Sequence, residues 1–325
     1  MTSGSDNGRG YSASAPTTVL PAMLATLVDE LVEDARIVAW SEGIHQRAEY
    51  LTVRNAVLRH LVERQAIRVV AAETNFALSR PADAYIRGAG SDTPNEEVVR
   101  GMWSWGRAAL RANLELLCWL RLHNAELPDR DRVRFYGLDM FGYDRHAPTD
   151  SGAALTDPED KHLAATLNAR LTAHLMTGGD HRAIAVRDAA QYLSLKTIAH
   201  RHPSSRLFLF EQTEHLDPRA PGSLGAHLAR GELGTSRTVG AVWRDGDPTV
   251  TYPLGRYREL SRWLMNHPGD LIEAPDGTGI IDLRPWRTPT AETDHPLTAA
   301  AAAFDAVLYA PASTVALPWP AAPAR

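Results

Sequence analysis

The feature of this sequence that most constrains its fold is the alternation of short apolar runs with longer helical stretches along 325 residues. The apolar runs show no strict alternation with polar residues, which is typical of strands covered on both faces. Strands that alternate with helices predict a mostly parallel central sheet flanked by helices, an α/β fold. The predicted strands are Arg36–Trp40, Ile67–Ala72, Arg132–Tyr136, Arg206–Phe210, Thr238–Trp243, Gly279–Leu283 and Ala306–Tyr309.

The segments between these runs carry helical patterns. We expect helices at about Pro21–Asp34, Arg47–Arg64, Glu96–Asn124, Asp157–Met176, His181–His200 and Gly255–Asn266. The length suits one large domain, which we place at 19–317. Within it, 141–181 combines Asp, Pro and Gly loops with one helix and predicts a helical cap or lid. Residues 1–18 predict a disordered leader, and 318–325 a flexible tail.

Composition excludes several classes of partner. The formal charge is −5, and acidic and basic residues are mixed, so no basic block predicts binding to nucleic acid or to an anionic membrane. No apolar run of about 18 residues predicts a membrane span, and the leader lacks the apolar segment of a secretion signal. Cys118 is the only cysteine, which excludes an internal disulfide and a Cys-rich zinc site. We therefore expect a cytoplasmic protein.

Acidic residues and histidines follow the predicted strands. In open α/β sheets, ligands bind beyond the carboxyl ends of the strands. Four strands each contribute polar residues at that point, in chain order Glu42 and His45, then Glu73, then Asp139, then Glu211, Gln212, Glu214 and His215. Acids and bases from four separate segments therefore meet at one edge of the sheet, where we expect a catalytic site.

The segment Ser41–His45 joins a predicted strand to a predicted helix. The start of that helix would direct backbone N–H groups and a positive dipole end toward the same edge. A histidine there can take a proton from water near neutral pH, and a carboxylate beside it can orient the ring. The alternative interpretation is that His45 only caps the helix.

Arg54 lies within the apolar stripe of the helix predicted at Arg47–Arg64. An unpaired buried charge is very costly, so its guanidinium must meet a carboxylate or a ligand. Glu42, Glu73 and a substrate anion are the candidate partners, and a purely structural Arg–Glu pair is the alternative. The opposite side of this helix, with Thr52, Asn55, Arg59 and Glu63, is expected to face solvent.

The remaining candidates each have a structural alternative. Glu73 would otherwise be a strand-end carboxylate in solvent, Asp139 a cap of the next turn, and His215 a surface-loop histidine. The pair Trp103 and Trp105 is interpreted as core or pocket wall. No P-loop or G-x-G-x-x-G motif occurs, and neither Glu42-x-x-His45 nor Glu211-x-x-x-His215 has the HExxH spacing, so we expect no cofactor and no metal.

Taken in order, several segments resemble the erythromycin esterase family, which also contains succinoglycan-biosynthesis-like proteins. They span about residues 20 to 318 and are Arg36–His45, the helix carrying Arg54, Arg68–Glu73, Leu117–Asn124, Val133–Met140, Arg187-Asp188, Leu207–His215, Gly222–Leu228 and Phe304–Val307. The resemblance implies a hydrolase without a serine nucleophile. In it, His45 would activate water toward an ester or lactone carbonyl, surrounded by Glu42, Arg54, Glu73 and His215.

The sequence departs from the family pattern at four positions. Ser41 and Gln46 stand where the family usually has glycine, before the first Glu and after the first His. Gln212 and Thr213 replace the first His and the Asn of an H-N-x-H block, of which His215 is the last residue. Gln212 can donate a hydrogen bond but cannot shuttle a proton, so the acid half of the acid/base arrangement is altered.

Three functions remain open from the sequence. The first is hydrolysis of an ester or lactone in a polyketide-like natural product, with Gln212, Glu214, Asp139, Trp103 and Trp105 contacting the substrate. The second is a biosynthetic tailoring enzyme in which His45 drives a cyclisation, elimination or epimerisation without water. The third is a non-catalytic protein that binds a small molecule.

Overall fold

The computed structural model describes residues 19–95, 98–99, 110–140, 155–175, 180–250, 253–288 and 293–316. Its strands are β1 (Ile37–Glu42), β2 (Ile67–Asn75), β3 (Arg134–Asp139), β4 (Arg206–Gln212), β5 (Ser236–Trp243), β6 (Ile272–Glu273), β7 (Gly279–Asp282) and β8 (Ala306–Ala310). Its helices are α1 (Ala22–Val32), α2 (Ala48–Arg64), α3 (Arg80–Ile86), α5 (Arg111–Ala125), α6 (Pro158–Leu175), α7 (Asp180–Arg201), α8 (Thr213–Leu216), α9 (Leu224–Leu228), α10 (Arg258–Asn266) and α11 (Pro296–Ala301).

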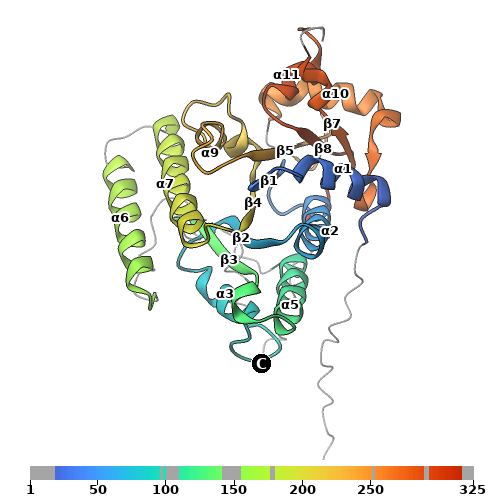
Figure 1. The fold of residues 1–325 in the computed structure, drawn as a ribbon. Coiled ribbons are helices and arrows are strands. Elements are labelled where there is room, and N and C mark those ends of the chain that lie inside the picture. Colours follow the sequence, from blue (N-terminus) through green and yellow to red (C-terminus); the bar gives the residue numbers. More distant parts are fainter. Residues whose placement is uncertain are drawn as a thin grey trace, which may run out of the picture.

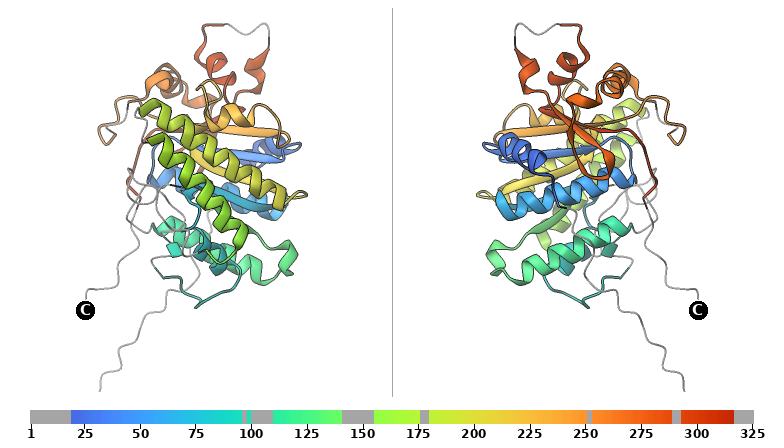
Figure 2. Two further views of the ribbon diagram at one scale, coloured as in Figure 1. Left: turned by 90° about the vertical axis from the view of Figure 1, so that its left-hand side faces the viewer. Right: turned by 90° about the vertical axis from the view of Figure 1, so that its right-hand side faces the viewer.

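The strands form one sheet in the order β3-β2-β4-β1-β5-β8-β7-β6. All pairs from β3 to β8 are parallel, and only β7 and β6 add to the edge in antiparallel fashion. Helices cover both faces: α1, α2 and α5 lie on one side, and α7 with α9 on the other (Figures 1 and 2). The predicted α/β class with a mostly parallel sheet is confirmed.

The core divides into layers on the two faces of the sheet. Val38 and Phe208 point toward the helices on the α2 side, whereas Ile37 and Leu207 point toward α7, because successive side chains of a strand alternate. Burial of both strand faces explains why these runs lack polar alternation. No helix within the described residues is long and apolar enough to cross a membrane.

Element bounds differ from the prediction in places. The third strand was expected at Arg132–Tyr136, but β3 spans Arg134–Asp139. The reason is that the Asn124 side chain takes up both backbone hydrogen-bonding groups of Val133. Its oxygen accepts from the Val133 N–H at 2.7 Å, and its amide nitrogen donates to the Val133 carbonyl at 2.9 Å. The sequence did not predict α3, which has seven residues and is too short for a periodic pattern.

The predicted cap is only partly described. Its helix is present as α6, which packs along α7 through Leu163, Leu167 and Leu171 (Figure 1). Residues 141–154 and 176–179 lie outside the described residues, so the role of this segment as a lid stays a prediction. The predicted leader, the predicted tail, and Trp103 and Trp105 also lie outside them.

Candidate active site

The strand order brings the sequence-predicted acids to one edge. Strands β3, β2, β4 and β1 are neighbours, and all run parallel, so their carboxyl ends lie side by side. Glu42 is in register with Gln212, and Asn75 with Asp139. The pairing of the strands therefore brings the four predicted segments to the same edge of the sheet.

Side-chain alternation then divides these residues between the two faces of the sheet. Glu42 follows Val38 and Trp40 of the α2-side layer, whereas Glu73 follows Val69 and Ala71 of the α7-side layer. We call Glu42, His45 and Arg54 the α2-side group. The α7-side group consists of Glu73, Asp139, Arg187, Asp188, Glu211 and His215.

Glu42 and His45 form a dyad at the end of β1. Nδ1 of His45 donates to Oε1 of Glu42 at 2.7 Å. The Glu42 side chain is buried, whereas 19% of the His45 side chain is exposed, so this ring reaches the surface of the site. Burial raises the pKa of Glu42 to about 7, although the hydrogen bond from His45 acts to lower it. The dyad fixes the ring and assigns any proton transfer to Nε2.

Gly43 allows the chain to turn between the two members of the dyad. A Cβ at this position would lie 2.8 Å from the Tyr50 hydroxyl and 2.9 Å from the Trp243 ring. Tyr50 is fully buried and donates to the carbonyl of Val242 at 3.0 Å, so it has no room to retreat. A larger residue at position 43 would therefore displace the dyad.

Arg54 is buried, as its place in the apolar stripe predicted, with 3% of its surface exposed. Its guanidinium donates to Oδ1 of Asn55 at 2.8 and 3.0 Å and to Oδ1 of Asn113 at 2.8 Å. It also lies over the Phe210 ring, 4.9 Å from the centroid. Within the described residues it makes no ion pair, so the expected salt bridge to Glu42 or Glu73 is absent. Burial lowers the pKa of Arg54 to about 10, and Glu42 opposes this shift.

The side of α2 predicted to face solvent does so at Glu63 but not at Asn55 and Arg59. Asn55 is buried and donates to the carbonyl of Ala112, and Arg59 lies over the Trp119 ring. Helix α5 covers this side, so α2 is buried on two faces. Polar residues that bond to a neighbouring helix cannot be distinguished from solvent residues by periodicity.

Arg187 of α7 is the centre of the α7-side group. Its Nη2 donates to Glu73 and to Asp139, both at 2.6 Å, and its Nε donates to Asp139 at 3.0 Å. Burial alone lowers the pKa of Arg187, but Asp139 and Glu73 raise it overall. Burial likewise acts to raise the pKa of Glu73, yet His45, Arg187 and His215 hold it well below its usual range.

His215 lies in α8 and is buried, not in a surface loop. Its Nδ1 donates to Asp188 at 2.7 Å, and its Nε2 accepts from Nη1 of Arg187 at 3.0 Å. The surrounding carboxylates, Asp188 first, outweigh burial and raise the pKa of His215. The contact with a guanidinium nevertheless requires a lone pair on Nε2, so we assign the neutral ring with its proton on Nδ1.

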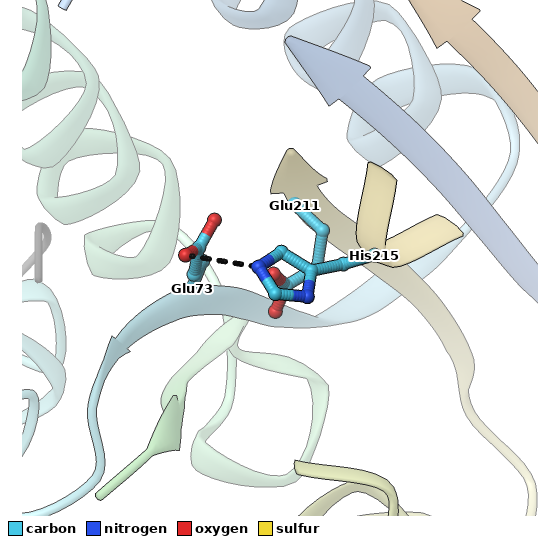
Figure 3. Close-up of side chains that lie close together, drawn as sticks. All are labelled: Glu73, Glu211 and His215. Carbon is cyan, nitrogen blue, oxygen red and sulfur yellow. Dashed lines mark ion pairs between the residues drawn. The ribbon is translucent and has the colours of Figure 1, made fainter. Parts of the chain in front are cut away.

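Glu211 completes this group. It is fully buried, and neither carboxylate oxygen has a hydrogen-bond partner. Burial and the neighbouring Glu73 raise its pKa well above the usual value. Figure 3 shows the Glu73 and Glu211 side chains beside the imidazole of His215, with Nε2 of His215 3.7 Å from Glu73. Donor atoms of these three residues all lie within 4.8 Å of one another, a spacing that could hold a metal ion.

The other residues predicted to contact substrate differ in how exposed their side chains are. Gln212 is partly buried, and its backbone N–H donates to Glu73 at 3.2 Å. Glu214 is exposed, and Asp139 is occupied by Arg187. The structure adds three residues to the predicted site, Arg187, Asp188 and Glu211. In the sequence, Glu211 was indicated by its place at the end of an apolar strand. Arg187 and Asp188 of α7 were indicated only by the family resemblance.

Comparison with known proteins agrees with this architecture. Residues 62–173 match the family model for erythromycin esterase. The fold is similar to that of a Bacillus cereus protein, with a TM-score of 0.63, 15% identity and coverage of 94% of both chains. It is similar to the erythromycin esterase EreC, seen as a mutant in its open conformation, with a TM-score of 0.60, 14% identity and coverage of 93% of this chain and 96% of that one.

A succinoglycan biosynthesis protein gives a TM-score of 0.60 at 11% identity, with coverage of 93% of each chain. These TM-scores and coverages establish a common fold over nearly the whole chain, and the family model matches about a third of it. Residues 62–173 thus match the erythromycin esterase family model, and nearly the whole chain shares its fold with the erythromycin esterase EreC and with a succinoglycan biosynthesis protein.

Proposed function

We propose that the chain is a hydrolase that uses His45 as a general base on an ester or lactone of a polyketide-like natural product. The observation that carries the proposal is the Glu42–His45 dyad, with Nδ1 tied to a buried carboxylate at 2.7 Å and the ring partly exposed. Such a ring is oriented before substrate arrives, which is the requirement for a general base.

In the proposed reaction, Nε2 of His45 takes a proton from water while the water oxygen attacks the acyl carbon. The bond from this carbon to the ester oxygen then breaks, and the protonated ring returns its proton to the departing alcohol. One histidine thus serves as base and then as acid. The use of a single histidine for both steps fits a site in which Gln212, an amide that cannot transfer a proton, replaces the family histidine.

Arg54 is proposed to stabilise the oxyanion that develops on the acyl group. Its guanidinium is buried and neutralised by no carboxylate within the described residues, being held by the Asn55 and Asn113 oxygens. A fixed positive charge at low dielectric stabilises developing negative charge strongly. The electrostatic effect of Glu42 on the pKa of Arg54 supports this role, because it couples the guanidinium to the dyad.

A tailoring enzyme that moves a proton without water is the second candidate. The observation that favours it is Gln212, because a site with a single proton-transfer histidine also suits a cyclisation, elimination or epimerisation. Both candidates require His45, and they differ in whether oxygen from water enters the product.

The test compares the wild-type chain with His45→Gln on aryl esters and macrolactones, with products detected by mass. Hydrolysis predicts a mass gain of one water, carrying the isotope when labelled water is used. We expect His45→Gln to lower kcat/KM by about 10²- to 10⁴-fold. His200→Gln, at an exposed histidine near the end of α7, is the matched control and should retain activity.

Equal activity of His45→Gln and wild type would refute the base. Turnover that depends on His45 without incorporation of labelled oxygen would favour the tailoring enzyme. No conversion of any ester or lactone by folded protein would remove the hydrolytic proposal.

A further inference from the structure

The α7-side group contains more negative charge than its hydrogen bonds account for. Four carboxylates, from Glu73, Asp139, Asp188 and Glu211, surround one guanidinium, that of Arg187, and a histidine assigned as neutral. When all four are ionised the group carries an excess of three negative charges, and every member is at least nine-tenths buried. Uncompensated buried charge is very costly, so a further cation beside a carboxylate that has no donor among the described residues would stabilise the group.

Glu211 marks where that partner belongs. Asp139 and Glu73 accept from Arg187, and Asp188 accepts from His215 and from the backbone of Leu224. Glu211 accepts from no described residue, although both of its oxygens are fully buried. Buried carboxylates without a donor are rare in folded proteins, and they call for an ion or a proton. Figure 3 shows this carboxylate directed toward Glu73 and His215.

His215 is oriented as a metal ligand would be. Its Nδ1–H is donated to Asp188, which leaves a lone pair on Nε2; this atom accepts from Arg187 and lies 3.7 Å from Glu73. Metal-binding histidines almost always donate their other ring N–H to a carboxylate or carbonyl in this way. The three ligand atoms, one nitrogen and two carboxylate oxygens, lie within 4.8 Å of one another.

We propose that Glu73, Glu211 and His215 bind a divalent transition-metal cation such as Zn²⁺ or Co²⁺. One imidazole with two carboxylates suits this class of ion better than Mg²⁺ or Ca²⁺, which prefer oxygen ligands alone. Two positive charges reduce the excess of the group from three negative charges to one.

Arg187 makes room without leaving the group. Its Nη1 holds Nε2 of His215 at 3.0 Å and would release that atom to the ion. Its Nε and Nη2 remain on Asp139 at 3.0 and 2.6 Å, so the guanidinium keeps a two-bond anchor. The proposal does not depend on hydrolysis at His45, because it concerns binding alone.

The experiment is equilibrium dialysis of the chelator-stripped full chain against Co²⁺ and against Zn²⁺, with metal content and the visible absorption of bound Co²⁺ as readouts. Wild type should bind about one equivalent with a nitrogen-and-oxygen ligand spectrum. Glu211→Gln keeps the shape of the side chain and should weaken binding by about 100-fold. Asp188→Asn, which leaves the ligands but replaces the charged acceptor of the His215 Nδ1–H with a neutral amide oxygen, should weaken it by about 10- to 100-fold.

Glu232→Gln, at a surface carboxylate paired with Lys196, is the matched control and should bind as wild type does. Circular dichroism establishes that each variant is folded. Binding that survives in Glu211→Gln would place the metal elsewhere and overturn the proposal. So would the absence of binding in folded wild type, which would leave a proton as the partner of Glu211. Dialysis uses no substrate, so either result is separate from the test of His45.

Discussion

The two groups at the strand ends differ in how their charges are held. On the α2 side, Glu42 bonds to a partly exposed His45, and among the described residues Arg54 donates to amide oxygens and to no carboxylate. On the α7 side, Arg187 is bonded at once to Glu73, Asp139 and His215, all of them buried. The first group keeps an exposed ring and an unneutralised cation, as a reacting centre needs. The second is a cross-linked charge network, whose removal should cost stability before it costs chemistry.

We expect the largest effect on stability from a substitution that breaks this network. Arg187→Leu removes the guanidinium that donates to the buried carboxylates of Glu73 and Asp139. We expect the free energy of unfolding to fall by about 3–5 kcal/mol, the usual cost of breaking a buried ion pair. Urea denaturation measures it. Lys196→Leu on the same helix removes an exposed pair with Glu232 and should cost about 1 kcal/mol or less. Equal losses in the two variants would contradict the contrast between the groups.

The next prediction concerns the pH dependence of the α2 side. Because burial raises the pKa of Glu42 from 4.5 to about 7, the folded chain holds a proton that the unfolded chain releases between these values. This contribution to stability is present below the unfolded pKa and is lost as pH rises through the folded pKa. Glu42→Gln removes the titration and keeps an oxygen to accept from Nδ1 of His45.

Relative to wild type, the Glu42→Gln variant should therefore gain stability by up to about 3 kcal/mol between acid and mildly alkaline pH. Urea unfolding of both proteins across this range is the measurement. A difference that does not change with pH would show that the Glu42 carboxylate is as well solvated in the folded chain as in the unfolded one.

A smaller effect is expected at the junction between the two groups. Strands β1 and β5 pair only as far as Trp40 and Val239, and beyond that point Thr213 bridges them. Its Oγ1 accepts from the N–H of Ala241 at 3.0 Å and lies 3.1 Å from the Glu42 carbonyl. Thr213→Val keeps the shape and leaves that N–H without a partner, which should cost about 1–2 kcal/mol.

Because Thr213 begins α8, which carries His215, the same change tests whether the groups are mechanically joined. Thr197→Val, at a half-buried threonine that bonds only within α7, is the matched control and should cost less. Stability in Thr213→Val equal to that of the control would show that β1 and β5 need no bridge here.

The α2-side group could be found from sequence because each member sits in a local pattern. Glu42 and His45 lie in a strand-to-helix turn, and Arg54 interrupts an apolar stripe, so strand order was enough to bring Glu42 near the other acids. What the pattern missed was the partner of Arg54. Two asparagines hold it, one from α5, and no periodicity reveals which amides meet across helices.

Only half of the α7-side group could be predicted from the sequence. Glu73, Asp139 and His215 follow strands, but Arg187 and Asp188 lie inside a long helix whose sequence shows no clean apolar face. Their role depends on how α7 packs on the sheet, which brings Arg187 to Glu73 of β2 and Asp139 of β3 and is a property of the tertiary fold. The same holds for Glu211, since its isolation is visible only when every neighbouring donor has been assigned.

The smallest expected effect lies next to His45, where the backbone of Gln46 has a left-handed φ of 61°. Side chains disfavour this conformation by about 1–2 kcal/mol, which explains why the family usually has glycine there. Gln46→Gly should raise the free energy of unfolding by about 0.5–1 kcal/mol, since the greater freedom of unfolded glycine offsets part of the relief.

Ala66→Gly, with φ 54° between α2 and β2, relieves the same strain far from the dyad and should leave turnover unchanged. If Gln46→Gly stabilises the chain but slows turnover while Ala66→Gly only stabilises it, the strained turn contributes to holding His45 in place. A loss of stability in Gln46→Gly alone would show instead that contacts of the Gln46 side chain outweigh the strain.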